Sequence, residues 1–396
     1  MHLIILLLSP LLLFGSELKE SYLSDIERES FLLKKDAVKN STNKLENSWI
    51  NPINGSYRID FNNQNADKLQ QSQTISISID QPIFKSGGIF YAIEYAQNLR
   101  KAEKLTVEEA KKKSIKAVLN ILYSIREIEF QIEKQQFVVA NSDIDLQRKS
   151  EQYREGLLDS SFVDNALISK NSNQLITIDL KNQKRGLLLQ LQELSDIDHK
   201  DLELPTIKLI SEDKFLESDL LFKRADFDIE SKRYYKKMQF SRYLPSISLN
   251  ASYNYLDVDN PSFGGGRMAL QDYHLDYYQF GFKLSIPIVD LARGYDNEQA
   301  KIDYLQSKVD KRNLERKLKL RYRLTLEKVD NIEKKIDLAK ENLLLYRNLL
   351  KDTESLYSAG LRTELDVENL KNSIEIKILE IEVLKLNRQK LLLELL

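Results

Sequence analysis

The sequence predicts an α+β membrane protein that combines long helical hairpins with four transmembrane β-strands in each chain. Two observations predict this class. Apolar residues recur at helical spacing over very long stretches, and four short segments alternate strictly between apolar and polar residues. Glycine (12) and proline (7) are scarce, which favours uninterrupted helices. Helices of this length do not fit a compact domain, so they are expected to pack as long coiled-coil-like pairs.

Residues 1–16 predict a signal peptide. The block "MHLIILLLSPLLLF" is apolar but too short to span a membrane, and Gly15 and Ser16 follow it. The block carries no Lys or Arg, and bulky Phe14 precedes the expected cleavage point. A retained N-terminal anchor therefore stays open as an alternative. No other run of the sequence is long and apolar enough to predict a transmembrane helix.

The mature chain reads as two copies of one unit. Pro82 and Pro287 lie 205 residues apart, and Gly156 and Gly360 lie 204 apart. Each copy therefore runs from strand to proline, long helix, a Tyr-x-x-Gly turn and a returning helix, which predicts an internal duplication. An N-terminal helix is expected ahead of the strands in the first copy, and an equatorial segment and a helix in the second. The copies are residues 17–202 and 203–396.

The residue pattern of each copy predicts one very long helix. No Pro or Gly interrupts residues 295–359, and apolar residues there fall mostly at spacings of three and four. At 1.5 Å per residue such a helix is about 100 Å long. The first copy repeats the pattern over residues 89–155. Returning helices are predicted at residues 159–193 and 364–396.

Four segments predict β-strands by strict alternation: residues 56–62, 74–80, 246–255 and 278–286. Each strand therefore has one apolar and one polar face. A half-buried soluble sheet and a membrane β-barrel both give this pattern. The tyrosines favour the barrel, because five of them crowd near one loop, as in the aromatic girdle of a membrane interface. These are Tyr253, Tyr255, Tyr273, Tyr277 and Tyr278.

Four strands cannot enclose a lumen, because a closed barrel needs about eight. An open edge in lipid would leave backbone groups unpaired, each at a cost of several kcal/mol. The chain is therefore predicted to oligomerise. Three copies of four strands give a barrel of about 12, with about 12 helices below it, whereas two copies give a narrow barrel of about eight. The polar, glycine-rich loop at residues 257–276 is typical of one that faces the exterior.

In this order, the segments resemble the TolC-like outer-membrane efflux proteins. The resemblance rests on the duplicated proline-to-glycine helix, on Arg224 and Asp226 ahead of "YLPSISL", and on "YSAGLRTELDV" at 357–367. It implies a homotrimer with a 12-stranded β-barrel in the outer membrane of a Gram-negative cell. A long α-helical coiled-coil barrel, a 12-helix tunnel, would extend from it into the periplasm. The far end would dock a periplasmic adaptor, or membrane fusion protein, that connects to an inner-membrane transporter.

The resemblance places a pore gate at the second turn. Tyr357, Arg362 and Asp366, with Thr363 among them, match the family pattern. In the family the Tyr and Arg bond a neighbouring helix, and the Asp forms a negative ring at the constriction. Three carboxylates at a narrow axis concentrate negative potential and separate cations from anions. The ordinary alternative is a solvated pair of Arg362 and Asp366 one turn apart, worth about 0.3 kcal/mol.

The first turn departs from this pattern, because Phe162 stands at the position that matches Asp366. An acidic partner for Arg362 is therefore missing from its expected place, and we expect Asp159 or Asp164 to pair with it instead. The adaptor is expected to dock at the tips of both turns, although a glycine there also simply allows the chain to turn. The tip residues are Glu155, Gly156, Leu157, Ala359, Gly360 and Leu361.

The predicted function is a passive exit duct of a tripartite efflux or type I secretion system, with the energy supplied elsewhere. A periplasmic adaptor and a structural coiled-coil protein of the envelope are the alternatives. Catalysis, cofactors and metal sites are not expected, because the chain has no cysteine and its three histidines are scattered. Nucleic acid is not an expected partner, because 59 basic residues face 60 acidic ones. The sequence does not specify the cargo.

Overall fold

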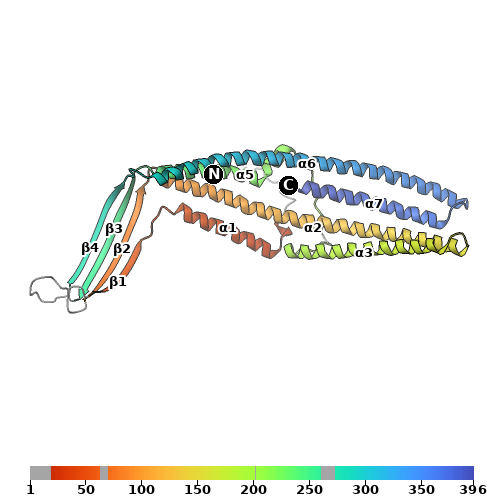
Figure 1. The fold of residues 1–396 in the computed structure, drawn as a ribbon, viewed down its shortest axis with the longest axis horizontal. Helices are drawn as coiled ribbons and strands as arrows, with labels where there is room; N and C mark the ends of the chain where they lie inside the picture. The colour runs from red at the N-terminus through yellow and green to blue at the C-terminus, as the bar shows by residue number, and fades with distance from the viewer. Residues whose placement is uncertain (1–18, 63–69, 201, 260–272) are drawn as a thin grey trace, which may run out of the picture. The chain divides into compact units, whose positions relative to one another are not determined.

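The computed structural model of the protein contains two compact units, each built from segments of both sequence copies (Figure 1). The sheet unit comprises residues 34–106 and 220–314, and the hairpin unit comprises residues 1–33, 107–219 and 315–396. The structure describes residues 19–62, 70–200, 202–259 and 273–396. The predicted signal peptide, residues 1–16, lies outside the described part of the chain.

Four antiparallel strands form one sheet in the order β1-β2-β3-β4. They are β1 (Asn54–Asn62), β2 (Gln70–Phe84), β3 (Ser246–Asp259) and β4 (Tyr273–Ser285). All four predicted strands are present, and each runs further than predicted at one end or both. The predicted exterior loop, residues 257–276, contributes its first and last residues to β3 and β4, and its middle lies outside the described residues.

The ladder between β2 and β3 is irregular at Pro82. The alternating pattern predicts that the strand ends at residue 80, but β2 continues to Phe84. Proline has no N–H to donate to the ladder, and the register with β3 shifts between Pro82 and Phe84. The two copies differ here, because Pro287 lies beyond the end of β4.

The strand register gathers the apolar side chains on one face of the sheet. Ile77 lies opposite Tyr253, which in turn lies opposite Tyr278 on β4. A neighbouring row on the same face joins Ala251 to Phe280. These side chains are not covered within the chain: 78% of Tyr278 and 76% of Phe280 is exposed. The sheet therefore presents an open apolar surface.

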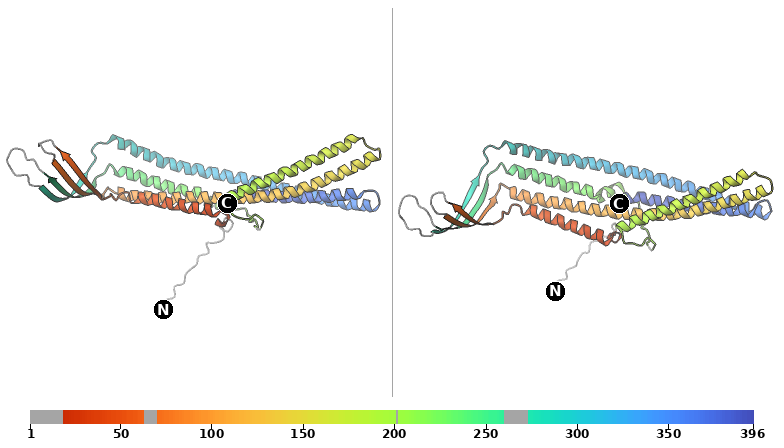
Figure 2. Two further views of the ribbon diagram at one scale, coloured as in Figure 1. Left: turned by 90° about the horizontal axis from the view of Figure 1, so that it is seen from below. Right: turned by 60° about the horizontal axis from the view of Figure 1, so that its bottom comes forward.

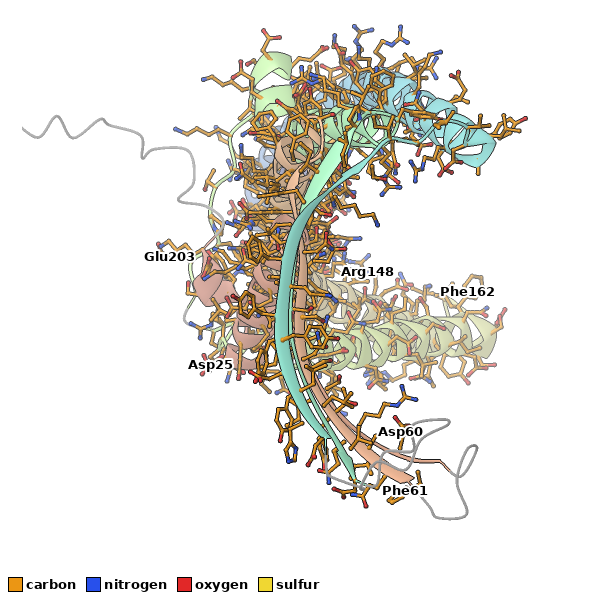
Figure 3. The ribbon with its side chains drawn as sticks, turned by 90° about the vertical axis from the view of Figure 1, so that its left-hand side faces the viewer. Asp25, Asp60, Phe61, Arg148, Phe162 and Glu203 are labelled. Carbon is orange, nitrogen blue, oxygen red and sulfur yellow. The ribbon has the colours of Figure 1, made fainter. Side chains whose placement is uncertain are left out.

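The other face of the sheet is polar. One of its rows joins Ser78, Ser252 and Gln279, and the next joins Ser76 to Asn254. Figure 3 shows side chains projecting from the strands, with Asp60 and Phe61 labelled near the end of β1. Hydroxyl and amide groups on this face suit contact with water, so the two faces differ in the solvent that they favour.

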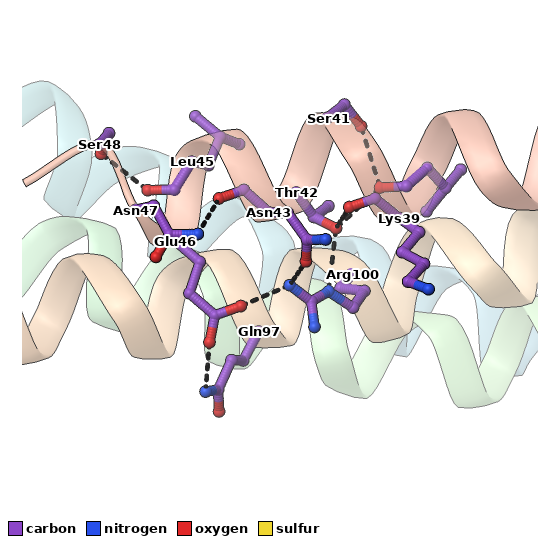
Figure 4. A network of polar contacts seen from close by, with 11 residues as sticks. Lys39, Ser41, Thr42, Asn43, Leu45, Glu46, Asn47, Ser48, Gln97 and Arg100 are labelled. Carbon is purple, nitrogen blue, oxygen red and sulfur yellow. Dashed lines mark hydrogen bonds and ion pairs between the residues drawn. The ribbon is translucent and has the colours of Figure 1, made fainter. Parts of the chain in front are cut away.

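A polar network joins two helices of the sheet unit, α1 (Asp25–Glu46) and the first part of α2 (Gly88–Arg154), as Figure 4 shows. The Arg100 guanidinium donates to Thr42 Oγ1 (2.9 Å) and Asn43 Oδ1 (2.6 Å) and forms an ion pair with Glu46. Gln97 donates to the same carboxylate at 2.9 Å. These directed bonds set the position of α1 along α2. The unit also contains α5 (Leu220–Ser241).

The hairpin unit contains two pairs of antiparallel helices, visible in Figures 1 and 2. The first pair is α2 with α3 (Ser160–Leu194), and the second is α6 (Leu291–Ser358) with α7 (Glu364–Leu393). All four agree with prediction to within a few residues. The start of α6 is earlier than predicted, because Gly294 is accommodated in its first turn. Among the described helices, none is both long and apolar enough to cross a lipid bilayer.

An extended segment, residues 195–200 and 202–211, crosses the helices of the hairpin unit, and we name it the strap. It leads into α4 (Glu212–Ser218). Buried Ile207 packs in one cluster with Leu119 and Leu122 of α2, and the short helix η1 (Glu20–Tyr22) adds Tyr22. Two tyrosines tie the strap down: the Tyr123 hydroxyl donates to the Pro205 carbonyl, and Tyr322 donates to the carbonyl of residue 210 at 2.7 Å. The strap thus closes the hydrophobic core on this side of α2 and α6.

Candidate functional site at the hairpin turns

The two helical hairpins turn in the same way. The amide of Gly156 donates to Tyr153 O (3.0 Å), and that of Leu157 donates to the carbonyl five residues earlier (2.8 Å). In the second hairpin Gly360 and Leu361 make the equivalent bonds, both at 2.9 Å. The glycines have φ of +74° and +75°, a left-handed conformation that other residues rarely adopt. Both turns are therefore Schellman motifs that stop a long helix at its glycine.

The helices that return from the turns are capped differently. Asp159 caps α3, and its carboxylate accepts from the Ser161 amide at 2.8 Å. Thr363 caps α7 in a reciprocal arrangement: its hydroxyl accepts from the Asp366 amide (3.3 Å), and the Asp366 carboxylate accepts from the Thr363 amide (3.1 Å). This capping box satisfies two backbone donors at the start of α7. Asp366 is thus held by backbone geometry.

Replacing Thr363 with alanine should loosen the first turn of α7. The substitution removes one half of the capping box and should cost about 1 kcal/mol of local helix stability. Hydrogen exchange of the Asp366 amide measures this, and about fivefold faster exchange is expected. Thr363→Ser keeps the hydroxyl and serves as the control. Equal exchange rates of the Asp366 amide in the alanine variant and the native protein would show that the capping box does not stabilise the turn.

Asp366 also forms an ion pair with Arg148 of α2, 2.8 Å from Nη2 to Oδ1. The hydrogen bond from the Thr363 backbone lowers the pKa of Asp366 most, and the charges of Arg148 and Arg362 lower it further. The carboxylate therefore stays ionised at pH values below the usual pKa range of an aspartate. The pair joins the second hairpin to the first, about two helical turns from each glycine tip.

The sequence did not single out Arg148. It lies within a helix face of mixed charge, and nothing in a single sequence shows which cation of α2 will face α7. Figure 3 labels Arg148 together with Phe162, which lies on α3 and is 45% exposed. The position that matches Asp366 in the first hairpin therefore makes no ion pair, and the acidic group of the second hairpin bonds across to α2 instead.

The other predicted gate residues lie on the surface of the turns. Tyr357, Arg362 and Asp164 are all exposed. In the described residues of one chain, neither Arg362 nor Asp164 takes part in an ion pair, and Asp159 serves as a helix cap. The expected bond of Arg362 to Asp159 or Asp164 stays a prediction. The apolar tips are open, with 68% of Leu157 and 71% of Leu361 exposed.

The fold and the duplicated hairpins are similar to those of outer-membrane channels of known structure. The family model described as "Outer membrane efflux protein" matches residues 213–395. No curated protein matches the chain. Among solved structures, the outer membrane protein VceC of Vibrio cholerae is similar, with a TM-score of 0.72 and 14% identity over 93% of both chains. The Campylobacter jejuni CmeC channel has a TM-score of 0.73 and 13% identity over 95% of this chain and 83% of its own.

The Neisseria gonorrhoeae MtrE channel in its open state gives a TM-score of 0.70 at 14% identity, covering 93% of this chain and 85% of its own. At such identities these structures establish the fold. The family match adds the class: the model of the outer membrane efflux proteins matches the second copy of the repeat. The predicted resemblance to TolC-like efflux channels, the predicted channel function and the predicted outer-membrane location are thereby confirmed.

Proposed function

We propose that three copies of this chain form the exit duct of a tripartite efflux system, closing three four-stranded sheets into a barrel of about 12 strands. The sheet supports this proposal most strongly. Its exposed apolar face suits contact with lipid, and its other face, rich in hydroxyl and amide groups, suits a water-filled lumen. In the described residues, β1 and β4 each pair on one side only. Pairing β4 of one copy with β1 of the next would satisfy the backbone hydrogen-bonding groups at both sheet edges.

The long hairpins would extend this pore as a periplasmic tunnel that ends at the Gly156 and Gly360 turns. Asp366 lies beside the turn, ionised and fixed in place by Thr363 and Arg148. Three such carboxylates around an axis form a negative ring that selects cations at the constriction. In this proposal the Asp366–Arg148 pair, with Arg362 and Tyr357 at the surface, holds the entrance closed.

The exposed tips would dock a periplasmic adaptor, which links the duct to an inner-membrane transporter. Leu157 and Leu361 present an apolar side chain at each turn, and Glu155 and Ala359 precede the glycines. Repeated around a trimer, this gives six similar apolar points, which suit the helical hairpins of a partner that binds by packing. Transport through the duct would be passive, since the transporter supplies the energy.

Membrane fractionation followed by planar-bilayer recording tests the proposed function. The purified protein should come from the outer membrane and conduct ions in discrete steps that favour cations. A periplasmic adaptor or a structural coiled-coil protein would not insert or conduct. Recovery in the soluble periplasmic fraction, or a silent bilayer at protein amounts that give channels for a control porin, would reject the proposal.

A further inference from the structure

A basic cavity opens in the hairpin unit where α2, α6 and the end of α7 meet. Its volume is about 760 Å³, within the range of about 300–1,000 Å³ of small-molecule sites. The lining includes six cationic side chains but a single carboxylate, that of Glu394. The cations are Lys113, Lys116, Arg321, Lys328, Lys335 and Lys390.

Most of these cations have no acidic partner. Lys390 pairs with Glu127 at 2.9 Å, and Arg321 donates to the backbone carbonyl of Glu394. In the described part of the chain the other four lysines form no ion pair. Elsewhere on these helices a lysine commonly pairs three or four residues away, as Lys334 does with Asp330. The cavity therefore has an excess of positive charge that its own walls do not neutralise.

Part of the cavity lining is apolar. Ala117, Ile332, Leu391 and Leu393 line it together with the charged side chains. Lysine stems are also apolar up to the ammonium group, so they extend this surface toward the opening. A site of this composition suits a ligand with an apolar body and an anionic head.

The strap leaves the cavity open. On α2 the cavity is lined by Lys113, Lys116, Ala117 and Asn120, a spacing that defines one helix face. The core under the strap uses other positions of the same helix, among them Val118 and Leu122. The basic face therefore points away from the strap, and no described segment of the hairpin unit covers it.

We propose that this cavity binds amphipathic organic anions, compounds with an apolar body and a carboxylate, sulfonate or phosphate group. The apolar body would rest on Ile332 and Leu391, and the anionic group would lie among Lys116, Lys328 and Lys335. Charge-assisted bonds to such a group are stronger than neutral ones. The proposed binding depends only on the residues that line the cavity, so it does not depend on whether the chain forms an ion-conducting channel.

Lys116 gives the binding a distinctive pH dependence. Burial, together with the charges of Lys112 and Arg321, lowers the pKa of Lys116 to about 8. Above that pH the side chain loses its charge, so anion binding should weaken as pH rises from 7 to 9. The charged groups that act on Lys116 or line the cavity with it lie on several elements. They are Lys112, Lys113 and Glu109 of α2, Asp219 ahead of α5, Arg321, Lys328 and Lys335 of α6, Lys390 of α7, and Glu394 after it.

Calorimetric titration with 2-naphthalenesulfonate tests the proposal on the full-length protein in a non-ionic detergent. The double variant Lys116→Gln/Lys328→Gln should bind about tenfold or more weakly. Lys351→Gln, an exposed lysine further along α6, should bind as the native protein does. The uncharged 2-naphthalenemethanol should bind about tenfold less tightly than the sulfonate. Lys116→Gln alone should abolish the loss of affinity between pH 7 and 9.

Equal affinity of the double variant and the native protein, or equal affinity of the alcohol and the sulfonate, would overturn the proposal. Absence of binding to the native protein would overturn it too. If the native protein does not bind the sulfonate and the double variant also loses its oligomeric state, then a carboxylate of a neighbouring copy occupies the cavity instead. Should the double variant fail to fold, Lys335→Gln alone provides the same comparison, because this side chain is exposed.

Discussion

Replacing Phe280 with arginine is expected to prevent assembly of the channel in the outer membrane. Phe280 lies near the middle of β4, on the apolar face, and 76% of its surface is exposed in the chain. If lipid covers this face, an arginine there costs about 2–4 kcal/mol per chain, or about 6–12 kcal/mol for three. The variant should be absent from the outer-membrane fraction and should accumulate as a degraded or aggregated species.

The adjacent residue supplies a matched control. Gln279 precedes Phe280 on the same strand and therefore points to the polar face, in a row with Ser252. Gln279→Arg places the same charge into the proposed water-filled lumen. This variant should reach the outer membrane as oligomer, with an altered conductance. Equal amounts of both variants in that fraction would show that the apolar face does not contact lipid.

The alternating pattern predicted the strands well because one buried or lipid-facing side imposes period two on the sequence. It predicted their ends less well. Hydrogen bonding continues past the last alternating residue, as it does through Pro82, where a shift in register accommodates the proline. The pairing order β1-β2-β3-β4 joins strands about 170 residues apart in the sequence, and propensity alone carries no information on that pairing.

The helices and their turns were equally accessible to sequence analysis, because long periodic stretches and a Tyr-x-x-Gly signal fix them locally. Gly156 and Gly360 have the left-handed φ that the turns require. The Arg148–Asp366 pair could not be predicted, since it depends on how α2 and α7 are rotated against each other. The tyrosine anchors of the strap depend in the same way on tertiary packing.

Removing the charge of Arg148 is expected to open the proposed gate. Arg148→Gln breaks the bond to Asp366 but leaves the capping box of α7 intact, so it isolates the ion pair from helix stability. The two side chains are partly exposed, at 39% and 20%, so the pair is worth about 0.2–1 kcal/mol. Three copies would contribute about 0.6–3 kcal/mol, which changes the ratio of open to closed channels about 3- to 150-fold. Single-channel recording should show this as a larger open probability.

Combined variants separate the possible partners of the gate. Asp366→Asn should have the same effect as Arg148→Gln, and the double variant should add little, because both remove one bond. Arg126→Gln, which breaks an exposed pair on the same helix, should leave the conductance unchanged. Substituting Arg362 together with Asp159 and Asp164 tests the second predicted bond, and unchanged conductance would exclude it. Additive effects of Arg148→Gln and Asp366→Asn would instead mean that the carboxylate acts alone, as a ring of charge at the axis rather than as one half of a bond between helices.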